Sequence, residues 1–406
     1  MTELSNQPLT QTHNQFLAET LQPFRQEFTA LATKTYFNYG GQGPLPRAAL
    51  TAIVNAYETI QRLGPFSRQA LLWMAQIEEQ LRQTIATALG VAPQTVTLTE
   101  NVTVGCNIAL WGIEWQRGDH IILSDCEHPG VVGAVRELQR RFGVEVSICS
   151  FLDTANQRDP IAAVVRLLRP QTRLVVLSHV LWNTGQVIPL AALIAACRAA
   201  DTSGRLQFLV DAAQSVGMLP LNLSELDVDF YAFTGHKWWC GPEGVGGLYV
   251  RPEALVMLSP TFIGWRGIEI DPMAHPSGWK PDGRRFEIAT SASPLWAGLR
   301  AAIELHPGWG TPQARYHRIL ELAAYCWQRL QELPTVACLR KTPPESGLVA
   351  FQVANVGHEQ LVKSLENRGV LVRTIRNPDC VRVSLHYFTL ESEIDQLIEV
   401  LQEICR

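Results

Sequence analysis

Seven short apolar runs between residues 95 and 250, separated mostly by helical stretches, constrain the fold of this chain more than any other feature. Several runs are apolar at nearly every position, which is typical of strands buried on both faces of a sheet. Because amphipathic helical patterns such as 130–142 and 189–200 fill the gaps, we predict an α/β fold with a mainly parallel seven-stranded sheet covered on both sides. The predicted strands are residues 95–99, 120–124, 144–150, 173–178, 207–211, 230–234 and 245–250.

The pattern changes in the last third of the chain. The last two predicted strands are too close for a long crossover, so we expect them to pair antiparallel at one side of the sheet. After a stretch rich in glycine, proline and tryptophan, a long helical run at 294–333 is followed by strand, helix, strand, strand and helix from Leu348 onward. The expected division is an N-terminal segment at 1–30, partly disordered and packing on the small domain, a large α/β domain at 31–285 and a smaller α+β domain at 286–406.

Composition excludes several classes of protein. The chain has 406 residues and a net charge of -4, and its Lys and Arg residues are scattered, so no nucleic-acid-binding surface is indicated. No apolar run reaches the length of a membrane span, and the polar N-terminus lacks signal-peptide features, so we expect a cytoplasmic protein with a loose N-terminal tail. The nine cysteines show neither a disulfide framework nor metal-ligand spacing, so most should be buried thiols and no metal is expected.

Lys237 is the most distinctive candidate for chemistry. It follows the predicted strand 230–234 directly and precedes a glycine-rich turn. The end of such a strand is where open α/β folds bind ligands. Phe233, Trp238 and Trp239 flank the amine, and desolvation would lower its pKa and make a Schiff base feasible. The alternative is an ordinary surface lysine in a loop.

Asp211 and Gln214 follow the preceding predicted strand. A carboxylate there can pair with a protonated pyridine nitrogen, and a nearby amide can hydrogen-bond a phenolic oxygen. Alternatively, Asp211 simply caps a helix. Lys237 stands 26 residues later at the end of the next strand, and that combination favours a cofactor site.

Two further strand ends carry candidate residues. His128 follows the predicted strand 120–124, where its ring could stack on a cofactor, although a loop histidine is the simpler alternative. Thr103, with the backbone of Val102 and Val104, opens a helix after the first strand, and a helix N-terminus is suited to phosphate.

Other site types are not supported. The glycine clusters at 40–43 and 241–247 match neither a dinucleotide fingerprint nor a P-loop. A GxSxG nucleophile motif is absent, so a serine hydrolase is not indicated.

Taken together, the motifs resemble class V, fold-type I pyridoxal-5'-phosphate (PLP) enzymes, the superfamily of cysteine desulfurases, kynureninases and cystine C-S lyases. The resemblance rests on the opening segment Tyr-Phe-Asn-Tyr-Gly-Gly-Gln-Gly-Pro-Leu-Pro from Tyr36, on Val-Asp-Ala-Ala-Gln-Ser from Val210, and on Thr-Gly-His-Lys from Thr234. It spans the chain from Tyr36 to the last helix, and it implies PLP-dependent fold type I.

The resemblance also implies a role for each matched residue. Lys237 would hold PLP as a Schiff base and shuttle protons, with Asp211 on the ring nitrogen, Gln214 on the phenolic oxygen and His128 stacked on the ring. Three other predicted sets are the phosphate ligands Thr103, Val104, Thr234 and His236, the substrate ligands Gly41, Arg373 and Arg382, and Thr290, matched to a threonine that reaches the neighbouring subunit's phosphate. A homodimer with shared active sites is therefore expected.

Departures from the family patterns indicate the subfamily. Desulfurases need a mobile catalytic cysteine, whereas Cys380 runs straight into a predicted strand. The family's asparagine after Ser178-His179 is replaced, with Trp182 at its position and Asn183 one step later. Other variants, such as Arg-Asn-Pro-Asp-Cys-Val-Arg from Arg376, resemble cystine C-S lyases, in which a second arginine, matching Arg382, binds the carboxylate. A structural ion pair is the alternative for Arg382.

The expected function is β-elimination on cystine or cysteine. The products would be pyruvate, ammonia and persulfide or sulfide, used for iron-sulfur cluster assembly with a sulfur-accepting protein as partner. The open alternatives are a cysteine desulfurase using Cys380, another β-eliminase or aminotransferase of the class, and a non-catalytic PLP-binding or sulfur-scaffold protein.

Overall fold

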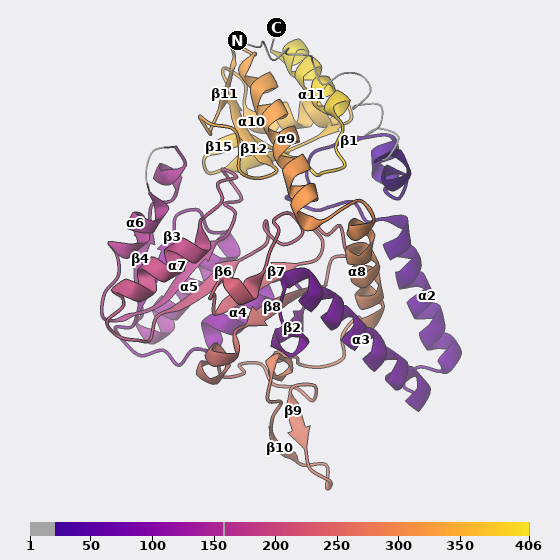
Figure 1. The fold of residues 1–406 in the computed structure, drawn as a ribbon, viewed down its shortest axis with the longest axis vertical. Coiled ribbons are helices and arrows are strands. Elements are labelled where there is room, and N and C mark those ends of the chain that lie inside the picture. Colours follow the sequence, from indigo (N-terminus) through magenta and orange to yellow (C-terminus); the bar gives the residue numbers. More distant parts are fainter. Residues whose placement is uncertain (1–20, 157–158, 406) are drawn as a thin grey trace, which may run out of the picture.

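The computed structural model describes residues 21–156 and 159–405, and its centre is a seven-stranded sheet (Figure 1). The strand order is β2-β8-β7-β6-β5-β3-β4. The strands are β2 (Val96–Thr99), β3 (His120–Ser124), β4 (Glu145–Cys149), β5 (Thr172–Ser178), β6 (Gln207–Asp211), β7 (Phe230–Thr234) and β8 (Gly246–Val250). Neighbours run parallel from β7 to β4, whereas β8 is antiparallel to both β7 and β2. The predicted sheet and its antiparallel last pair are confirmed.

Helices cover both faces of this sheet, as the apolar runs predicted. In β6, Phe208 and Val210 belong to one core and Leu209 to the other, so every position of the strand is enclosed. Helices α4 and α5 pack on one face, and α3, α7 and α8 on the other. The helices of this part are α2 (Arg47–Leu63), α3 (Arg68–Leu89), α4 (Val102–Gly112), α5 (Pro129–Phe142), α6 (Pro160–Val165), α7 (Leu190–Ala200) and α8 (Ser293–Leu305).

The helical run expected at 294–333 is interrupted. Helix α8 ends at Leu305, a single turn of 3-10 helix spans His306–Gly308, and α9 begins at Pro312 and ends at Gln331. Prolines at 307 and 312 explain the break, because proline supplies no N-H to continue a helix. Helix α8 packs against α2 and α3. Helix α8 therefore packs on the large domain and α9 on the small one, so the change falls after residue 286, where the sequence places the start of the small domain.

The smaller domain is a four-stranded antiparallel sheet with helices on one face. Its order is β11-β12-β15-β14. The elements are β11 (Val336–Cys338), β12 (Leu348–Val353), α10 (His358–Glu366), β14 (Arg373–Arg376), β15 (Asp379–Ser384) and α11 (Glu391–Ile404). Helices α9, α10 and α11 bury one face, and the apolar side of α11 is buried at Ile394, Leu397, Ile398 and Leu401. On the opposite face, Ile375 and Cys380 pack with Trp182 of the large domain.

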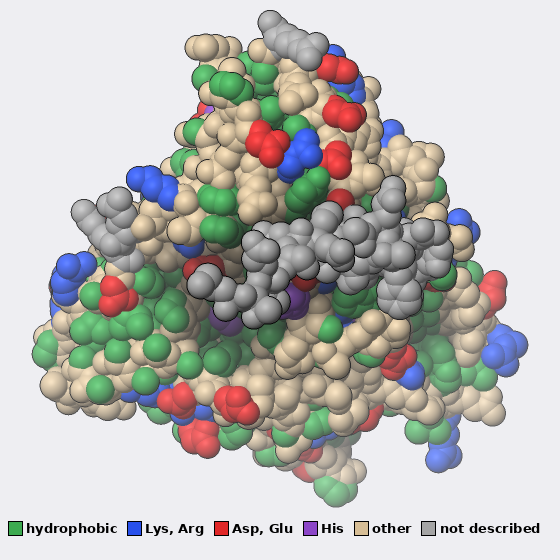
Figure 2. All heavy atoms as spheres, turned by 45° about the horizontal axis from the view of Figure 1, so that its top comes forward, with side chains coloured by type: hydrophobic (Ala, Val, Ile, Leu, Met, Phe, Trp, Pro, Cys, Tyr) green, Lys and Arg blue, Asp and Glu red, His purple; other side chains and the backbone are tan. Residues whose placement is uncertain are grey.

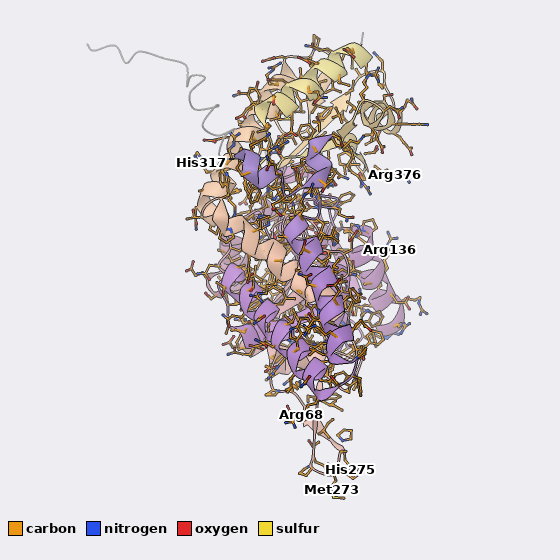
Figure 3. The ribbon with its side chains drawn as sticks, turned by 90° about the vertical axis from the view of Figure 1, so that its right-hand side faces the viewer. Arg68, Arg136, Met273, His275, His317 and Arg376 are labelled. Atoms are coloured by element: carbon orange, nitrogen blue, oxygen red, sulfur yellow. The ribbon has the colours of Figure 1, made fainter. Side chains whose placement is uncertain are left out.

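Two shorter features complete the fold. Strand β1 (Thr35–Tyr36) pairs with β13 (Val370–Leu371) and ties the start of the large domain to the small one. A hairpin of β9 (Ile268–Ile270) and β10 (Pro276–Trp279), which the sequence did not predict, projects from the body with Met273 and His275 at its tip (Figure 3).

The N-terminal segment is described from Leu21 onward. Phe28 stacks on Phe388, and Arg25 pairs with Glu393, so this part contacts the small domain. The disorder expected near the N-terminus concerns residues that lie mostly outside the described part. Among the helices described, none is long and apolar enough to cross a membrane.

Candidate active site

A cavity of about 900 Å³ lies where β5, β6 and β7 end and the small domain begins. Histidine side chains are visible in the hollow between the two lobes (Figure 2). Of the candidate site residues singled out in the sequence, those that line the cavity are Gly41, Val102, Thr103, Val104, His128, Asp211, Gln214, His236, Lys237, Arg373 and Arg382. Thr234 and Thr290 are not among its lining residues.

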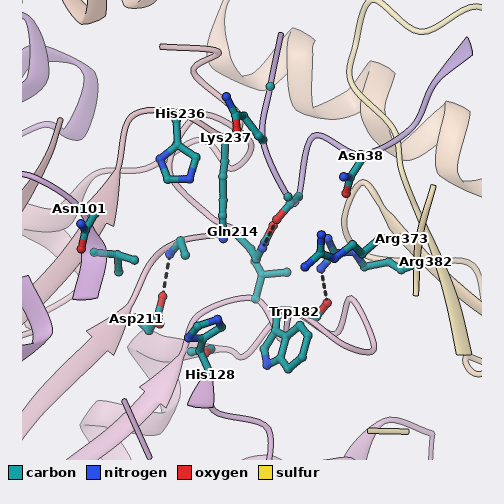
Figure 4. Close-up of a pocket in the computed structure, with 18 of the residues that line it drawn as sticks. Asn38, Asn101, His128, Trp182, Asp211, Gln214, His236, Lys237, Arg373 and Arg382 are labelled. Atoms are coloured by element: carbon teal, nitrogen blue, oxygen red, sulfur yellow. Dashed lines mark hydrogen bonds between the residues drawn. The ribbon is translucent and has the colours of Figure 1, made fainter. Parts of the chain in front are cut away.

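Lys237 extends toward the middle of this cavity, near Gln214 and Asp211 (Figure 4). Burial lowers the pKa of its amine to about 8; Asp211 opposes the shift, while Arg382 and Arg373 add to it. A substantial fraction of the amine is therefore neutral near physiological pH, as a nucleophile or base requires. The surface-loop alternative does not describe this position.

Asp211 ends β6 and is buried. Its Oδ1 accepts the N-H of Ala213 at 2.9 Å, so the capping alternative describes one oxygen only. Burial raises the pKa of the carboxyl, opposed by that hydrogen bond and by Lys237 and His128. A carboxylate held in this way is stabilised by a cationic partner.

Gln214 has a fixed side chain. Its Nε2 donates to the carbonyl of Gly40 at 2.8 Å, and its Oε1 accepts from the Trp238 Nε1-H at 3.0 Å. These bonds set the orientation of the amide, because only the nitrogen can donate. The second N-H of Nε2 has no partner among the described residues and is available to an acceptor in the cavity.

His128 both begins a helix and lines the cavity. Its Nδ1 accepts the N-H of Gly130 at 3.2 Å as the N-cap of α5, which leaves the ring proton on Nε2. The ring meets Trp182 edge-on, with centroids 6.0 Å apart. Burial lowers the pKa of His128, so the imidazole is neutral near pH 7.

The N-terminus of α4 is partly used by the protein itself. Asn101, which the sequence reasoning did not select, accepts the Val104 N-H on Oδ1 at 3.1 Å. This leaves the N-H groups of Val102 and Thr103 without backbone or side-chain partners among the described residues. The preference of asparagine for N-caps is the signal that could have identified Asn101.

Thr234 and Thr290 lie outside the cavity for different reasons. Thr234 is buried at the end of β7, and its Oγ1 lies 2.6 Å from His236 Nδ1, so it orients that ring. Thr290 is exposed and lines a second cavity of about 680 Å³ that shares Thr103 and Val104 with the first. A molecule bound in the second cavity would reach the α4 N-terminus from the other side.

Arg373 and Arg382 face each other across neighbouring strands. They are register partners in the β14-β15 pair, and their guanidinium groups lie side by side in Figure 4. Arg382 is buried and donates to the Trp182 carbonyl at 2.7 Å, but neither arginine forms an ion pair with any carboxylate in the described chain. Like charges directly opposite in a sheet are destabilising, so the pair indicates an anion site. The residues that the structure describes thus offer Arg382 no structural ion pair.

Two more polar groups beside the arginines received no role in the sequence analysis. Asn38 Oδ1 and Trp182 Nε1 are buried and have no hydrogen-bond partner within the described residues. Both side chains line the cavity, whereas Asn183 is turned away and donates to the Asn377 carbonyl. Buried polar groups are rarely left unpaired, so these atoms are expected to bind a ligand or water.

Glu127 is a buried carboxyl directly before His128. It accepts from the Ser178 N-H and hydroxyl at 2.8 and 2.9 Å and from the hydroxyl of Ser124. Burial and then the nearby Asp211 raise its pKa to about 8. The sequence gave no sign of it, because two of its three hydrogen bonds come from Ser178 on a distant strand.

The thiols are not placed for catalysis. Cys380 is fully buried between Ala350 and Ile375, and burial raises its pKa to about 12. No cysteine is found among the described residues that line the cavity. A group of His, Cys, Asp or Glu side chains suited to a metal is likewise not found in the part of the chain described.

Comparison with known proteins agrees with this geometry. Residues 35–397 match the family model "Aminotransferase class-V". The structure is similar to that of the cystine C-S lyase C-DES in complex with its reaction product cysteine persulfide, with a TM-score of 0.91 and 48% identity over 92% of this chain and 98% of that one. A C-DES variant with glycine covalently linked to its PLP cofactor gives a TM-score of 0.92, also at 48% identity, over 93% and 98%. Isopenicillin N epimerase of Streptomyces clavuligerus is 30% identical over 92% of this chain and 95% of its own length.

Proposed function

The chain belongs to the class V aminotransferase family of PLP enzymes, and on that premise we propose that it is a C-S lyase that performs β-elimination on cystine. The PLP cofactor and the fold type expected from the sequence are confirmed. One observation supports the assignment as a lyase. Lys237, with its lowered pKa, shares a cavity with two arginines that have no carboxylate partner, and no described residue lining that cavity is a cysteine. That arrangement supports removal of an α-proton but offers no thiol to accept sulfur.

The residues present suit PLP. The available Oδ2 of Asp211 would pair with the ring nitrogen, the second N-H of Gln214 would reach the phenolic oxygen, and His128 would lie against the ring. The first turn of α4 at Thr103 and the ring of His236 would hold the phosphate. PLP, when bound, supplies the electron sink that makes the α-proton acidic and β-elimination possible.

The side chains then perform three tasks. Arg373 and Arg382 bind the substrate carboxylate, which removes their mutual repulsion. Lys237, whose lowered pKa leaves part of the amine neutral, takes the α-proton on Nζ. As the β-carbon-sulfur bond breaks, one water is consumed overall, and cystine yields pyruvate, ammonia and cysteine persulfide.

We favour cystine over cysteine for two reasons. Persulfide is the better leaving group because its conjugate acid is stronger than a simple thiol. In addition, a cavity of about 960 Å³ adjoins the first and shares Asn38, His128, Trp182 and Arg373 with it, which leaves room for the second half of a disulfide. The persulfide would then pass to a sulfur acceptor for iron-sulfur cluster assembly, to be tested by cluster formation on an apo-ferredoxin.

We propose a homodimer with shared active sites. Large apolar side chains are exposed on the hairpin and the segments flanking it, namely Phe262, Ile263, Trp265, Ile270, Met273, Trp279 and Ile288. Exposed apolar side chains gathered in neighbouring segments mark sites of protein-protein contact. These residues adjoin Thr290, whose cavity opens on the α4 N-terminus, so a partner subunit bound there could contribute to phosphate binding. Sedimentation should give twice the chain mass; an active monomer at assay concentration would contradict the shared site.

A product assay tests the reaction. Purified protein with PLP is incubated with cystine and separately with cysteine, and pyruvate, alanine, persulfide and the D-isomer of the substrate are measured. Pyruvate with persulfide supports the lyase, and alanine would indicate a desulfurase. The D-isomer would indicate an epimerase, in line with the similarity to isopenicillin N epimerase. No product from either substrate would leave a PLP-binding or sulfur-scaffold role.

A further inference from the structure

The loop that carries Lys237 is held by its backbone to an unusual degree. Four consecutive carbonyls, those of residues 236–239, each accept a hydrogen bond, and the donors come from four segments. The donors are Gly43 N to His236 at 2.7 Å, Cys240 N to Lys237 at 3.0 Å, His386 Nε2 to Trp238 at 2.9 Å and His306 Nε2 to Trp239 at 3.0 Å. Only the Cys240 bond is a local turn.

The two histidines form a buried pair behind the loop. His306 follows α8 and His386 follows β15; they are 4% and 0% exposed, and their rings stack with centroids 5.8 Å apart. Neither lines the active-site cavity. They connect the large-domain helix and the small-domain sheet to the backbone beyond Lys237.

Hydrogen bonding fixes the protonation of both rings. His386 Nδ1 faces the N-H of Tyr387 at 3.1 Å, which can only donate, so the proton lies on Nε2 and points to the Trp238 carbonyl. His306 Nε2 faces the Trp239 carbonyl, so it also carries the proton, and its Nδ1 accepts from the Tyr387 hydroxyl at 2.8 Å. Both imidazoles are thus neutral and have a partner at each nitrogen.

Burial keeps the pair neutral. It lowers the pKa of His306 to about 4 and that of His386 well below its usual range. The charged and titratable groups near the pair are Arg315 on α9, which lowers both pKa values, and Tyr387 and Tyr39, which contact the rings. At neutral pH each ring is therefore a dependable donor to its carbonyl.

The two histidines, which together we call the histidine clamp, also act on the side chains of Trp238 and Gln214. The Trp238 indole stacks on His386 with centroids 5.7 Å apart, and its Nε1 holds Gln214. His386 lies four residues after Arg382 in the same segment. One stretch of the small domain therefore carries a substrate-facing arginine and fixes the backbone next to Lys237.

We propose that His306 and His386 are positioning residues that hold Lys237 and Gln214 in register with Asp211. This inference rests on the proposed role of Lys237 as the reacting amine. Errors of about 1 Å in placing a reacting group can cost about 10²-fold in rate, so a backbone anchor on the two residues after the lysine has a direct catalytic consequence.

Matched variants test the proposal in the PLP-loaded protein. His386→Leu and His306→Leu remove the donors, whereas His386→Gln and His306→Gln retain an amide N-H. His317→Leu on α9 is the control, because the His317 side chain is 76% exposed (Figure 3). The measurements are the pH titration of the visible absorption band of lysine-bound PLP, borohydride trapping on Lys237, kcat and KM for cystine, and thermal unfolding.

We expect the Leu variants to shift the midpoint of the absorption titration and to lower kcat by about 10- to 100-fold with little change in KM. The Gln variants should restore most of the wild-type titration midpoint and of the wild-type kcat, and the His317→Leu control should match wild type in both. Lower thermal stability with an unchanged titration and unchanged kcat would overturn the inference, as would Gln variants as impaired as Leu. If a Leu variant does not fold, the Gln variants decide by the same two readouts.

Failure of the proposed function can be told apart from failure of the histidine proposal. If borohydride does not trap PLP on Lys237 in wild type, both proposals fall. If trapping is normal but the substrate proves not to be cystine, the absorption titration still tests the clamp.

Discussion

The two walls of the active-site cavity differ in how completely their polar groups are satisfied. On the large-domain wall, Asp211, Gln214 and His236 each make hydrogen bonds within the protein, and the Lys237 backbone is anchored on several sides. On the small-domain wall, Arg373 and Arg382 repel each other without a carboxylate partner in the described chain. The first wall suits the resident PLP cofactor, and under the proposed function the second is stabilised when the substrate carboxylate binds.

Removing the reactive group of the large-domain wall should have the largest effect. Lys237→Ala is expected to reduce pyruvate formation by about 10³-fold or more, because the variant lacks the amine that is proposed both to hold PLP and to take the α-proton. Borohydride should attach PLP to Lys237 in wild type, as mass spectrometry of the peptide would show. Circular dichroism should show that the variant folds. Wild-type activity in this variant would eliminate the mechanism.

Replacing the arginines of the small-domain wall should mainly weaken substrate binding. Arg382→Ala is expected to cost roughly 2 to 4 kcal/mol in binding, or about 30- to 1000-fold in KM, through loss of a buried charge-assisted pair. Arg373→Ala should raise KM less, because Arg373 is exposed and water screens its charge. The exposed Arg136→Ala is the control. A fall in kcat with unchanged KM would place these arginines outside carboxylate recognition.

The lowered pKa of Lys237, on the large-domain wall, predicts that the rate of PLP uptake depends on pH. Only the neutral amine attacks PLP, so the rate of PLP uptake by the apoprotein should rise about tenfold per pH unit below pH 8 and level off above it. Stopped-flow absorbance from pH 6 to 10 measures this. A rate that keeps rising to pH 10 would mean that the lysine is solvated like a surface residue.

The smallest effect should come from Cys380, which lies behind the small-domain wall. Cys380→Ala and Cys380→Ser should change pyruvate formation from cystine by less than about threefold, because a buried thiol with a raised pKa is not a nucleophile. Any loss should accompany lower thermal stability, through packing. If sulfur release stops while PLP and substrate still bind, the desulfurase alternative replaces the lyase.

The sequence alone determined the sheet and the residues at its strand ends. Strands buried on both faces must be continuously apolar, and in parallel strands the carboxyl ends meet at one edge, so the sequence alone places Asp211 near Lys237. The matched motifs extended this to the cofactor. Local rules were enough wherever a residue's role follows from its place in its own element.

Only the tertiary structure decided features that depend on contacts between distant segments. The opposition of Arg373 and Arg382 depends on strand register, and His306 and His386 bond to carbonyls that lie 67 and 148 positions earlier in the chain. Glu127 and Asn38 acquire their surroundings from elements far along the chain. No local pattern encodes such neighbours, because burial and hydrogen-bond partners are properties of the packed chain rather than of a short window of sequence.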